Sequence, residues 1–169
     1  VVLELSSFQL HTMKTSPQVA VVTNITPNHL DYHKDYAEYI EAKKNILSFQ
    51  NQEGTAVLNL DNEVTAGLVK DAKGRVMTFS KKHVSADIYF DGTDIFLSGK
   101  KVLAASDIQI PGEHNVENYM AAIGAVYTLV PEEVIPIVAK TFGGVEHRIE
   151  LVRELGGVKY YNSSIDSSP

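Results

Sequence analysis

Short, uninterrupted apolar runs divide the first half of the chain into regular segments. Most of their side chains are aliphatic, and many are β-branched, which suits strands buried on both faces of a parallel sheet. The runs are residues 1–5, 19–23 and 55–60, and a fourth strand is expected over residues 75–80. Between them, apolar side chains recur at helical spacing and predict helices. These segments are residues 35–49 and 63–73, with a short helical turn over 7–14.

The pattern changes after Ala86, where the apolar runs shorten and glycines separate them. The expected elements are a hairpin of residues 88–90 and 95–97, a strand over 102–110, helices over 115–129 and 132–142, and a strand pair over 149–155 and 157–162. Pro131 suits the first position of the second helix. Strand–helix alternation followed by antiparallel strands predicts an α/β fold, with a mostly parallel sheet flanked by helices and a small antiparallel sheet.

Composition and charge narrow the class of protein. The 169 residues include 15 basic and 21 acidic side chains, and the net charge of −6 argues against nucleic-acid coating and a basic membrane-binding patch. There is no cysteine, which excludes disulfides, thiolate metal sites and cysteine nucleophiles. No apolar run approaches the roughly 20 residues of a membrane span. We therefore expect a cytoplasmic enzyme with neither nucleic-acid nor membrane partners.

The two ends of the chain lie within patterned segments. Val1 stands inside an apolar run and is not preceded by a methionine, and Pro169 closes a polar stretch. A strand needs partners for its polar backbone and its apolar face, so a domain seldom begins within one. We therefore expect the chain to be a piece of a longer polypeptide.

Glu4 is the first candidate for chemistry, because it lies near the carboxyl end of the first predicted strand. Ligands of open α/β sheets gather beyond these ends, where a carboxylate can hold Mg²⁺ beside nucleotide phosphates. A carboxylate that caps the next turn is the simpler interpretation, and Glu4 taken by itself favours this simpler interpretation.

A polar loop over residues 23–33 follows the second predicted strand and contains His29, Asp31 and His33. The histidines are four residues apart, as in a zinc pair on a helix, but Pro27 and the missing Glu of H-E-x-x-H argue against such a pair. One interpretation is a loop whose Asp31 caps the following helix. The position at a strand end and the residue types favour a functional loop.

Two adjacent lysines in the 35–49 helix differ in their surroundings. Lys43 lies about one turn from Tyr39 and Ile46, on a largely apolar side, whereas Lys44 is expected to point toward solvent. A lysine on an apolar face usually extends its amine to water. The sharper hypothesis is a partly neutral amine that is available for chemistry.

Two asparagines and an arginine complete the candidates. Asn115 is expected to cap a helix, and Asn118 presents a second amide one turn further on. Such amides can contact a purine edge or a phosphate, although capping alone explains Asn115. Arg148 follows a pair of glycines and is well placed to clamp phosphates across a domain cleft, with an exposed charged turn as the simpler interpretation.

Five sequence blocks occur in a characteristic order. They are E-L-S-S-F-Q-L from Glu4, T-N-I-T-P-N-H-L-D from Thr23, E-A-K ending at Lys43, G-E-H-N-V-E-N from Gly112, and E-H-R ending at Arg148. Over essentially the whole chain, this set resembles the Mur ligases of peptidoglycan synthesis. The first block and the H-R-x-E stretch are most similar to the D-glutamate-adding members.

The resemblance implies a central ATP-binding domain over residues 1–143 and the beginning of a C-terminal domain over 144–169. The family's phosphate loop, of the type G-x-x-G-K-[ST], does not occur in this sequence. The implied reaction uses ATP and Mg²⁺ to join D-glutamate to UDP-N-acetylmuramoyl-L-alanine through an acyl phosphate, in an enzyme expected to be a monomer. The chain by itself is expected to be inactive.

Individual roles also follow from the resemblance. Glu4, His29 and Lys43 match the catalytic metal site, with Lys43 carbamylated by CO₂ and thereby converted into an oxygen ligand. Ser6 matches a contact to the UDP-muramoyl substrate. Asn115, Asn118 and Arg148 match residues that bind ATP.

The family pattern N-D-S-K-A-T-N is altered in this chain. Ser163 replaces the aspartate that contacts the ATP ribose, and Ile165 replaces the lysine. Asp166 is therefore the remaining candidate for the ribose contact.

The D-glutamate-adding ligase has three alternatives as the function. They are another Mur ligase, a folylpolyglutamate synthase and a non-catalytic nucleotide-binding module.

Overall fold

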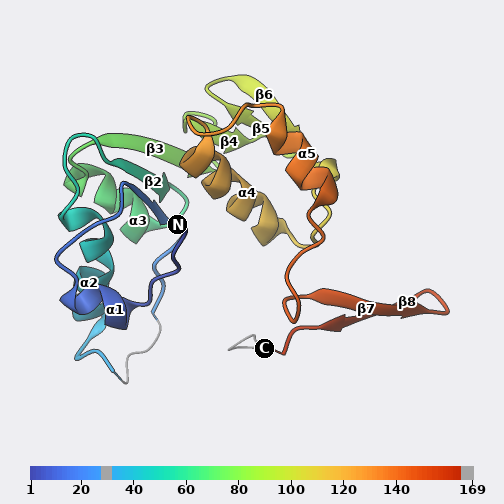
Figure 1. Cartoon of the computed structure of the whole chain (residues 1–169), viewed down its shortest axis with the longest axis horizontal. Helices are drawn as coiled ribbons and strands as arrows, with labels where there is room; N and C mark the ends of the chain where they lie inside the picture. Colours follow the sequence, from blue (N-terminus) through green and yellow to red (C-terminus); the bar gives the residue numbers. More distant parts are fainter. Residues whose placement is uncertain (28–31, 165–169) are drawn as a thin grey trace.

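The computed structural model describes residues 1–27 and 32–164. Its main sheet has the spatial order β1-β2-β3-β4-β5-β6. These strands are β1 (Val19–Val22), β2 (Thr55–Asn59), β3 (Arg75–Ser80), β4 (Ile88–Phe90), β5 (Asp94–Leu97) and β6 (Lys100–Ala104). The pairs from β1 to β4 are parallel, and those from β4 to β6 are antiparallel. The predicted α/β fold is confirmed (Figure 1).

Helices connect and cover the strands of this sheet (Figure 1). They are α1 (Ser7–Thr12), α2 (Tyr36–Ser48), α3 (Glu63–Gly67), α4 (Glu113–Val126) and α5 (Val134–Thr141), with 3₁₀ turns η1 (Leu68–Asp71) and η2 (Ala105–Asp107). In the described ranges 1–27 and 32–164, no helix has both the length and the apolar character needed to cross a bilayer.

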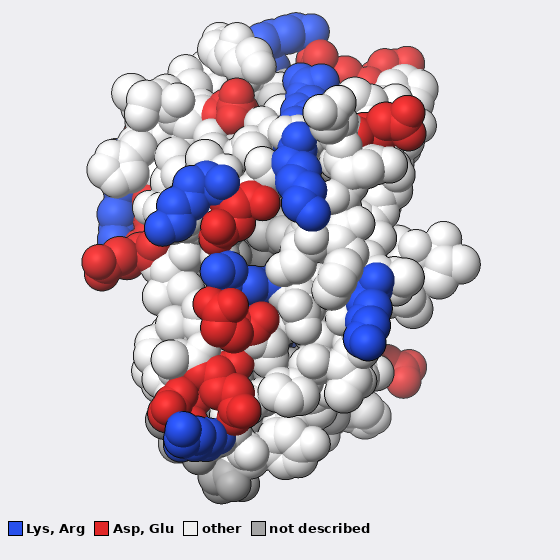
Figure 2. Space-filling model, turned by 90° about the vertical axis from the view of Figure 1, so that its left-hand side faces the viewer, with Lys and Arg blue, Asp and Glu red and all other residues white. Residues whose placement is uncertain are grey.

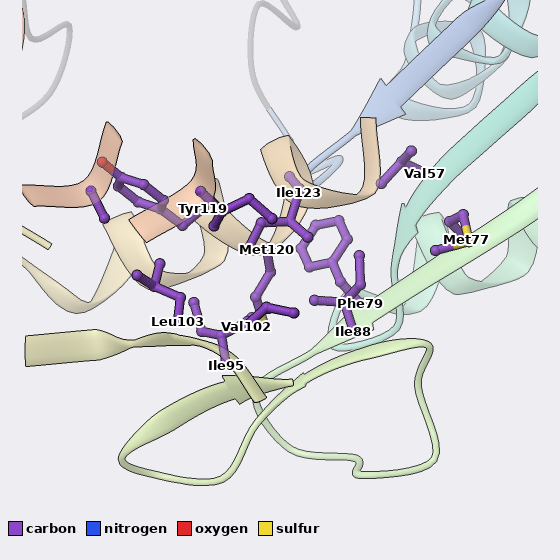
Figure 3. Close-up of a cluster of buried hydrophobic side chains, with 13 residues drawn as sticks. Val57, Met77, Phe79, Ile88, Ile95, Val102, Leu103, Tyr119, Met120 and Ile123 are labelled. Carbon is purple, nitrogen blue, oxygen red and sulfur yellow. The ribbon is translucent and has the colours of Figure 1, made fainter. Parts of the chain in front are cut away.

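Burial of β2 on both faces organises the core. Val57 packs on one side, in a cluster that includes Met120 of α4, and Figure 3 shows this cluster between α4 and the strands. Ala56 and Leu58 pack on the other side, in a cluster that includes Leu47 of α2. Because successive side chains of a strand point to opposite faces, both faces of the sheet need a helical cover. The uninterrupted apolar run over residues 55–60 reflects this requirement.

α4 approaches the sheet closely at Gly124. A Cβ atom at this position would lie 2.7 Å from Val57 Cγ1 and 3.0 Å from Ile88 Cδ1. Both of these side chains are fully buried and cannot move aside freely. The absence of a side chain at residue 124 therefore sets the distance between helix and sheet.

The strand predicted for residues 1–5 is wrong. These residues form no regular element, and the side chains of Val1, Val2 and Leu3 are exposed. An apolar run becomes a strand only where its backbone N–H and C=O groups find a neighbouring strand, and the described sheet pairs none with this segment.

Two predicted boundaries also change. The strand over 102–110 ends at Ala104, where η2 begins. The helix predicted over residues 132–142, with Pro131 at its first position, begins at Val134. Pro136 lies in its first turn, where the missing N–H removes no intrahelical hydrogen bond.

Two predicted helix caps are replaced by other residues. Asn115 lies inside α4 and is not its cap, because the helix begins at Glu113 behind Gly112. Asp31 lies outside the described residues, and α2 is capped by Asp35, whose side chain accepts a 2.9 Å hydrogen bond from the N–H of Glu38.

A separate two-stranded sheet follows the main sheet and helices. It consists of β7 (Glu150–Leu155) and β8 (Val158–Asn162), which pair antiparallel as predicted. Gly156 and Gly157 form the turn with φ angles of 59° and 79°, which glycine adopts without steric cost. Nearly all side chains of both strands are exposed, so this hairpin contributes no core of its own (Figure 1).

We predict opposite effects for alanine at two helical glycines. Gly124→Ala should lower the free energy of unfolding by about 1–3 kcal/mol, because the new methyl group overpacks the core against Val57. Gly67→Ala has open space around it and should raise this free energy by about 0.4–1 kcal/mol. Urea unfolding followed by circular dichroism measures both changes, and equal effects of the two substitutions would contradict the close approach of α4.

We also predict that limited proteolysis cuts near Gly143 and Gly144 before it cuts the first 140 residues. Every residue from Gly143 to Arg148 is exposed, and the hairpin that follows buries little apolar surface. Mass spectrometry of early fragments identifies the first cut. Uniform resistance across this segment would count against the proposed boundary between residues 143 and 144.

Candidate functional site

A pocket of about 310 Å³ lies between the start of α4 and the segment that follows α5. Its polar lining side chains are His114, Asn115, Asn118 and Arg148. The structure therefore brings together three residues that the sequence placed at the ATP site, although they come from segments about thirty residues apart. A volume near 300 Å³ is at the lower end for small-molecule sites and suits part of a nucleotide.

Hydrogen bonds fix the two asparagine amides in this pocket. The Nδ2 atom of Asn115 donates to the carbonyl oxygen of Pro111 at 2.6 Å. The Nδ2 atom of Asn118 donates to Oδ1 of Asn115 at 3.1 Å. Asn118 therefore keeps its own carbonyl oxygen as an oriented acceptor, and the expected placement of the two amides one turn apart is confirmed.

An apolar groove of about 350 Å³ continues from this pocket. The pocket and the groove share Ile110, Asn118 and Phe142. Tyr119 also lines the groove, and its buried hydroxyl group has no hydrogen-bond partner within the described part of the chain. Burial raises the pKa of this tyrosine. A ligand with a flat apolar ring and polar groups at its edge would suit the groove and the polar pocket beside it.

Arg148 stands in a tight, strained turn. Its neighbours His147 and Ile149 have φ angles of 66° and 46°, and a positive φ is rare for a β-branched residue. The turn is held by a 2.9 Å hydrogen bond from the N–H of His147 to Glu150, and by a 3.2 Å bond from the N–H of Ile149 to Ser163. Strain of this kind concentrates at functional sites, where surrounding contacts enforce it.

Lys43 and Glu4 form a second candidate region, beside α1 and α2. Lys43 is half-buried, and this burial lowers the pKa of its amine, while the Glu4 carboxylate partly opposes the shift. Its Nζ atom lies 5.9 Å from the ring centroid of Tyr39. Within residues 1–27 and 32–164, Lys43 makes no ion pair. The sharper hypothesis, an amine that burial biases toward its neutral form, therefore agrees with its surroundings.

Lys44 is partly buried and ion-paired, and does not simply point toward solvent as expected. Its Nζ atom lies 3.2 Å from Glu41 and 3.5 Å from Asp71, and these partners raise its pKa. Figure 2 shows basic and acidic side chains interspersed on the side of the molecule that carries α1 and α2. Adjacent residues of one helix thus differ in protonation bias, because burial dominates at Lys43 and carboxylate partners dominate at Lys44.

Two other predicted residues of this region have unexpected local roles. Glu4 is exposed and does not end a strand, so the argument from strand geometry that first selected it is wrong. Ser6 caps α1: its hydroxyl group accepts from the N–H of Gln9 at 3.3 Å and donates to Oε1 of Gln9 at 3.0 Å. His29 and Asp166 lie outside the described residues.

Sequence reasoning missed the asparagines that shape the strand ends near this region. Asn62 accepts a hydrogen bond from the N–H of Ile25 at 3.4 Å and donates to its carbonyl oxygen at 3.3 Å. Asn59 donates to the carbonyl oxygen of Thr23 at 2.9 Å. A sequence signal was available, since Asn59 ends the buried strand β2 and Asn62 caps the helix that follows it, and backbone groups need partners at both places.

The donor set suits Mg²⁺ better than zinc. Within the described residues, no three His, Asp or Glu side chains cluster closely enough to hold a metal ion by themselves. Mg²⁺ is typically held by one or two carboxylates together with phosphates and water, and Glu4 is the predicted carboxylate of this region. A zinc site needs three or four protein ligands.

Comparison with known proteins identifies the family of the chain. The model of the Mur ligase middle domain matches residues 1–126. A UDP-N-acetylmuramoylalanine–D-glutamate ligase from Acetivibrio thermocellus is 56% identical over 174 residues, which cover 100% of this chain and 37% of that protein. The ligase of the same name from Clostridium perfringens is 55% identical over 170 residues, with the same coverage. The chain thus spans 37% of the length of these relatives.

Solved structures share the fold. The crystal structure of MurF from Acinetobacter baumannii superposes with a TM-score of 0.76 at 19% identity, and covers 96% of this chain and 36% of that one. Likeness at this identity concerns the fold alone, whereas the family model and the relatives establish descent. The chain belongs to the Mur ligase family, and its residues 1–126 match the family's middle domain.

Proposed function

We propose that the chain is part of an ATP-dependent ligase that joins D-glutamate to UDP-N-acetylmuramoyl-L-alanine in peptidoglycan synthesis. The observation that carries this proposal is the 56% identity, over the whole chain, with a ligase of that name. Residues 1–143 would be most of the central ATP-binding domain, and residues 144–169 the beginning of the C-terminal domain. Cytoplasmic location and a monomeric state belong to the same proposal.

The pocket at α4 would hold the nucleotide. Asn118 supplies an oriented amide oxygen for a base or ribose donor, and Asn115 holds this amide in place. Arg148 supplies a positive charge, and its guanidinium can donate two parallel hydrogen bonds to a phosphate. These roles for Asn115, Asn118 and Arg148 are supported by their convergence on one pocket. Asp166 remains our candidate for the ribose contact.

The region of Glu4 and Lys43 would hold the metal, with His29 as a further ligand. Burial favours the neutral amine of Lys43, and only a neutral amine attacks CO₂ to form a carbamate. The resulting oxygen ligand and the Glu4 carboxylate would bind Mg²⁺, which supplies positive charge where phosphate and carboxylate anions meet. Ser6, in the turn between Glu4 and α1, would contact the UDP-linked substrate.

The proposed reaction has two steps. The substrate carboxylate attacks the γ-phosphorus of ATP, so that ADP leaves and an acyl phosphate forms. The D-glutamate amine then attacks the acyl carbon, the C–N bond forms, and inorganic phosphate leaves with the C–O electron pair. Alignment of two anions is the main difficulty, and residues of this chain address it by positioning the nucleotide and supplying positive charge.

An assay of phosphate release tests the activity. A full-length ligase that contains this chain should release phosphate from ATP only when UDP-N-acetylmuramoyl-L-alanine and D-glutamate are both present. The 169-residue chain alone should release none, because its sequence lacks the G-x-x-G-K-[ST] loop that such an enzyme needs for the phosphates. Release with another amino acid in place of D-glutamate would redirect the proposal within the family, and D-glutamate-dependent turnover by the chain alone would contradict it.

Replacement of Lys43 tests the carbamate. In the full-length ligase, Lys43→Ala should lower kcat about a hundredfold or more, because an oxygen ligand that stabilises developing charge is lost. Added short-chain carboxylic acids should restore part of the rate by occupying the vacated position. Undiminished activity of unsupplemented Lys43→Ala would show that this lysine merely extends its amine to solvent.

Lys44→Ala is the matched control for this experiment. Lys44 belongs to the same helix and carries the same charge, but it is engaged in surface ion pairs with Glu41 and Asp71. Loss of such pairs costs less than about 1 kcal/mol of stability, so turnover should stay near that of the parent enzyme. An equal loss in both variants would indicate a general effect of charge and not a ligand role.

A further inference from the structure

His33 is a buried polar residue that none of the roles above uses. Its exposed fraction is 3%, although a histidine at the end of a polar loop would ordinarily face water. His33 precedes Glu38 by five residues, and its Nδ1 atom lies 3.9 Å from the Glu38 carboxylate. Three separate segments surround the ring: α1, the residue before it in the loop, and α2.

The first contact of His33 joins it to α1. Its Nε2 atom shares a 2.9 Å hydrogen bond with the hydroxyl group of Ser7, which is itself only 1% exposed. The ring also stacks on Phe8, with an interplanar angle of 10° and centroids 5.7 Å apart. Ser7 directly follows Ser6 and lies three residues after Glu4, so His33 contacts the helix that begins next to these candidate site residues.

The second contact joins His33 to α2 beneath Lys43. The His33 ring meets the Tyr39 ring edge-on, at a centroid distance of 5.4 Å. The same Tyr39 ring lies 5.9 Å from Nζ of Lys43. Because Tyr39 is 6% exposed and Lys43 is one turn further along α2, the position of the lysine depends on how this ring is packed.

The described flanks of the polar loop are fixed at both sides. Before residues 28–31, Ile25 is tied to Asn62 and accepts a 3.0 Å hydrogen bond from the Tyr36 hydroxyl. After them, Tyr32 packs edge-on against Phe8 and His33. In this second flank, His33 is buried and shares a hydrogen bond with Ser7 of α1.

We propose that His33 is a positioning residue, which joins α1, the end of the loop and α2 and thereby places Glu4 and Lys43 relative to each other. This inference rests on the proposed function, because it concerns the same metal-binding region. His33 touches neither substrate nor metal in this account. It acts through Ser7 on one side and through Tyr39 on the other.

The same pair of helices offers a control contact. Asn45 of α2 donates from Nδ2 to the carbonyl oxygen of Leu10 at 2.9 Å, near the other end of α1. This bond also docks α1 on α2, but it is made near the end of α1 farther from Glu4. A residue that only stabilises the helix pair should resemble Asn45, whereas a positioning residue should not.

The test compares His33→Ala, His33→Phe, Ser7→Ala, the double variant Ser7→Ala/His33→Phe and Asn45→Ala in a full-length ligase. His33→Ala should raise the half-saturating Mg²⁺ concentration about tenfold, which is the effect expected when a residue that orients a metal ligand is lost. The KM for ATP should change less than about twofold. His33→Phe and Ser7→Ala should have smaller effects. The double variant should be no worse than either single one, since it leaves no buried partner unpaired.

A second readout needs no activity. Acetylation of lysines by an N-hydroxysuccinimide ester, followed by mass spectrometry without metal, should modify Lys43 about fivefold faster in His33→Ala than in the parent, because local opening exposes the amine. Asn45→Ala should leave this rate unchanged even at a similar loss of Tm. Since acetylation is measured on the 169-residue chain as well, it reports on His33 even if the ligase assay fails.

Either of two results would overturn the proposal. One is a His33→Ala enzyme whose Mg²⁺ requirement and Lys43 acetylation both equal those of the parent. The other is that the Mg²⁺ and ATP requirements of all variants, Asn45→Ala included, shift together in proportion to the loss of Tm. If His33→Ala does not fold, the milder His33→Phe and Ser7→Ala variants decide by the same criteria.

Discussion

Double-sided burial of β2 is the constraint on which the rest of the structure depends. Val57 needs cover on one face and Leu58 on the other, and α4 and α2 provide it. The two helices that carry the candidate site residues are therefore fixed to opposite faces of one sheet by the same strand. Asn115 and Lys43 owe their relative placement to this shared support, so a change in the core would disturb both regions of the site.

Polar side chains at the strand ends extend this order into the loops. Asn59 donates a hydrogen bond to the carbonyl oxygen of Thr23, and Asn62 accepts one from the N–H of Ile25. Both backbone groups lie beyond the end of β1. The edge of the sheet is thus held by side-chain amides where the ladder of strand hydrogen bonds stops. Precise sites benefit from such support, because loops alone position side chains loosely.

Much of the fold could be predicted because apolar periodicity reports burial, as the run at β2 and the hairpin at β7 and β8 illustrate. Residues 1–5 show the limit of that reasoning, since an apolar run says nothing about whether a strand lies beside it. For the site, residue types and block order selected Asn115, Asn118 and Arg148, which do line one pocket. The sequence placed His33 in the polar loop but predicted neither its burial nor its contact with Ser7, because these depend on segments distant in sequence, which no local pattern encodes.

The turn around Arg148 has a mechanical consequence. His147 and Ile149 bond to Glu150 and Ser163, which belong to the hairpin segment, and both have left-handed backbone conformations that resist rotation. Gly143, by contrast, has open space around it, and Gly144 has a φ of 104° that other residues rarely adopt. Rotation of the hairpin about these glycines would therefore carry the guanidinium of Arg148 with it as one rigid unit. The position of Arg148 at the pocket is therefore tied to the orientation of the hairpin.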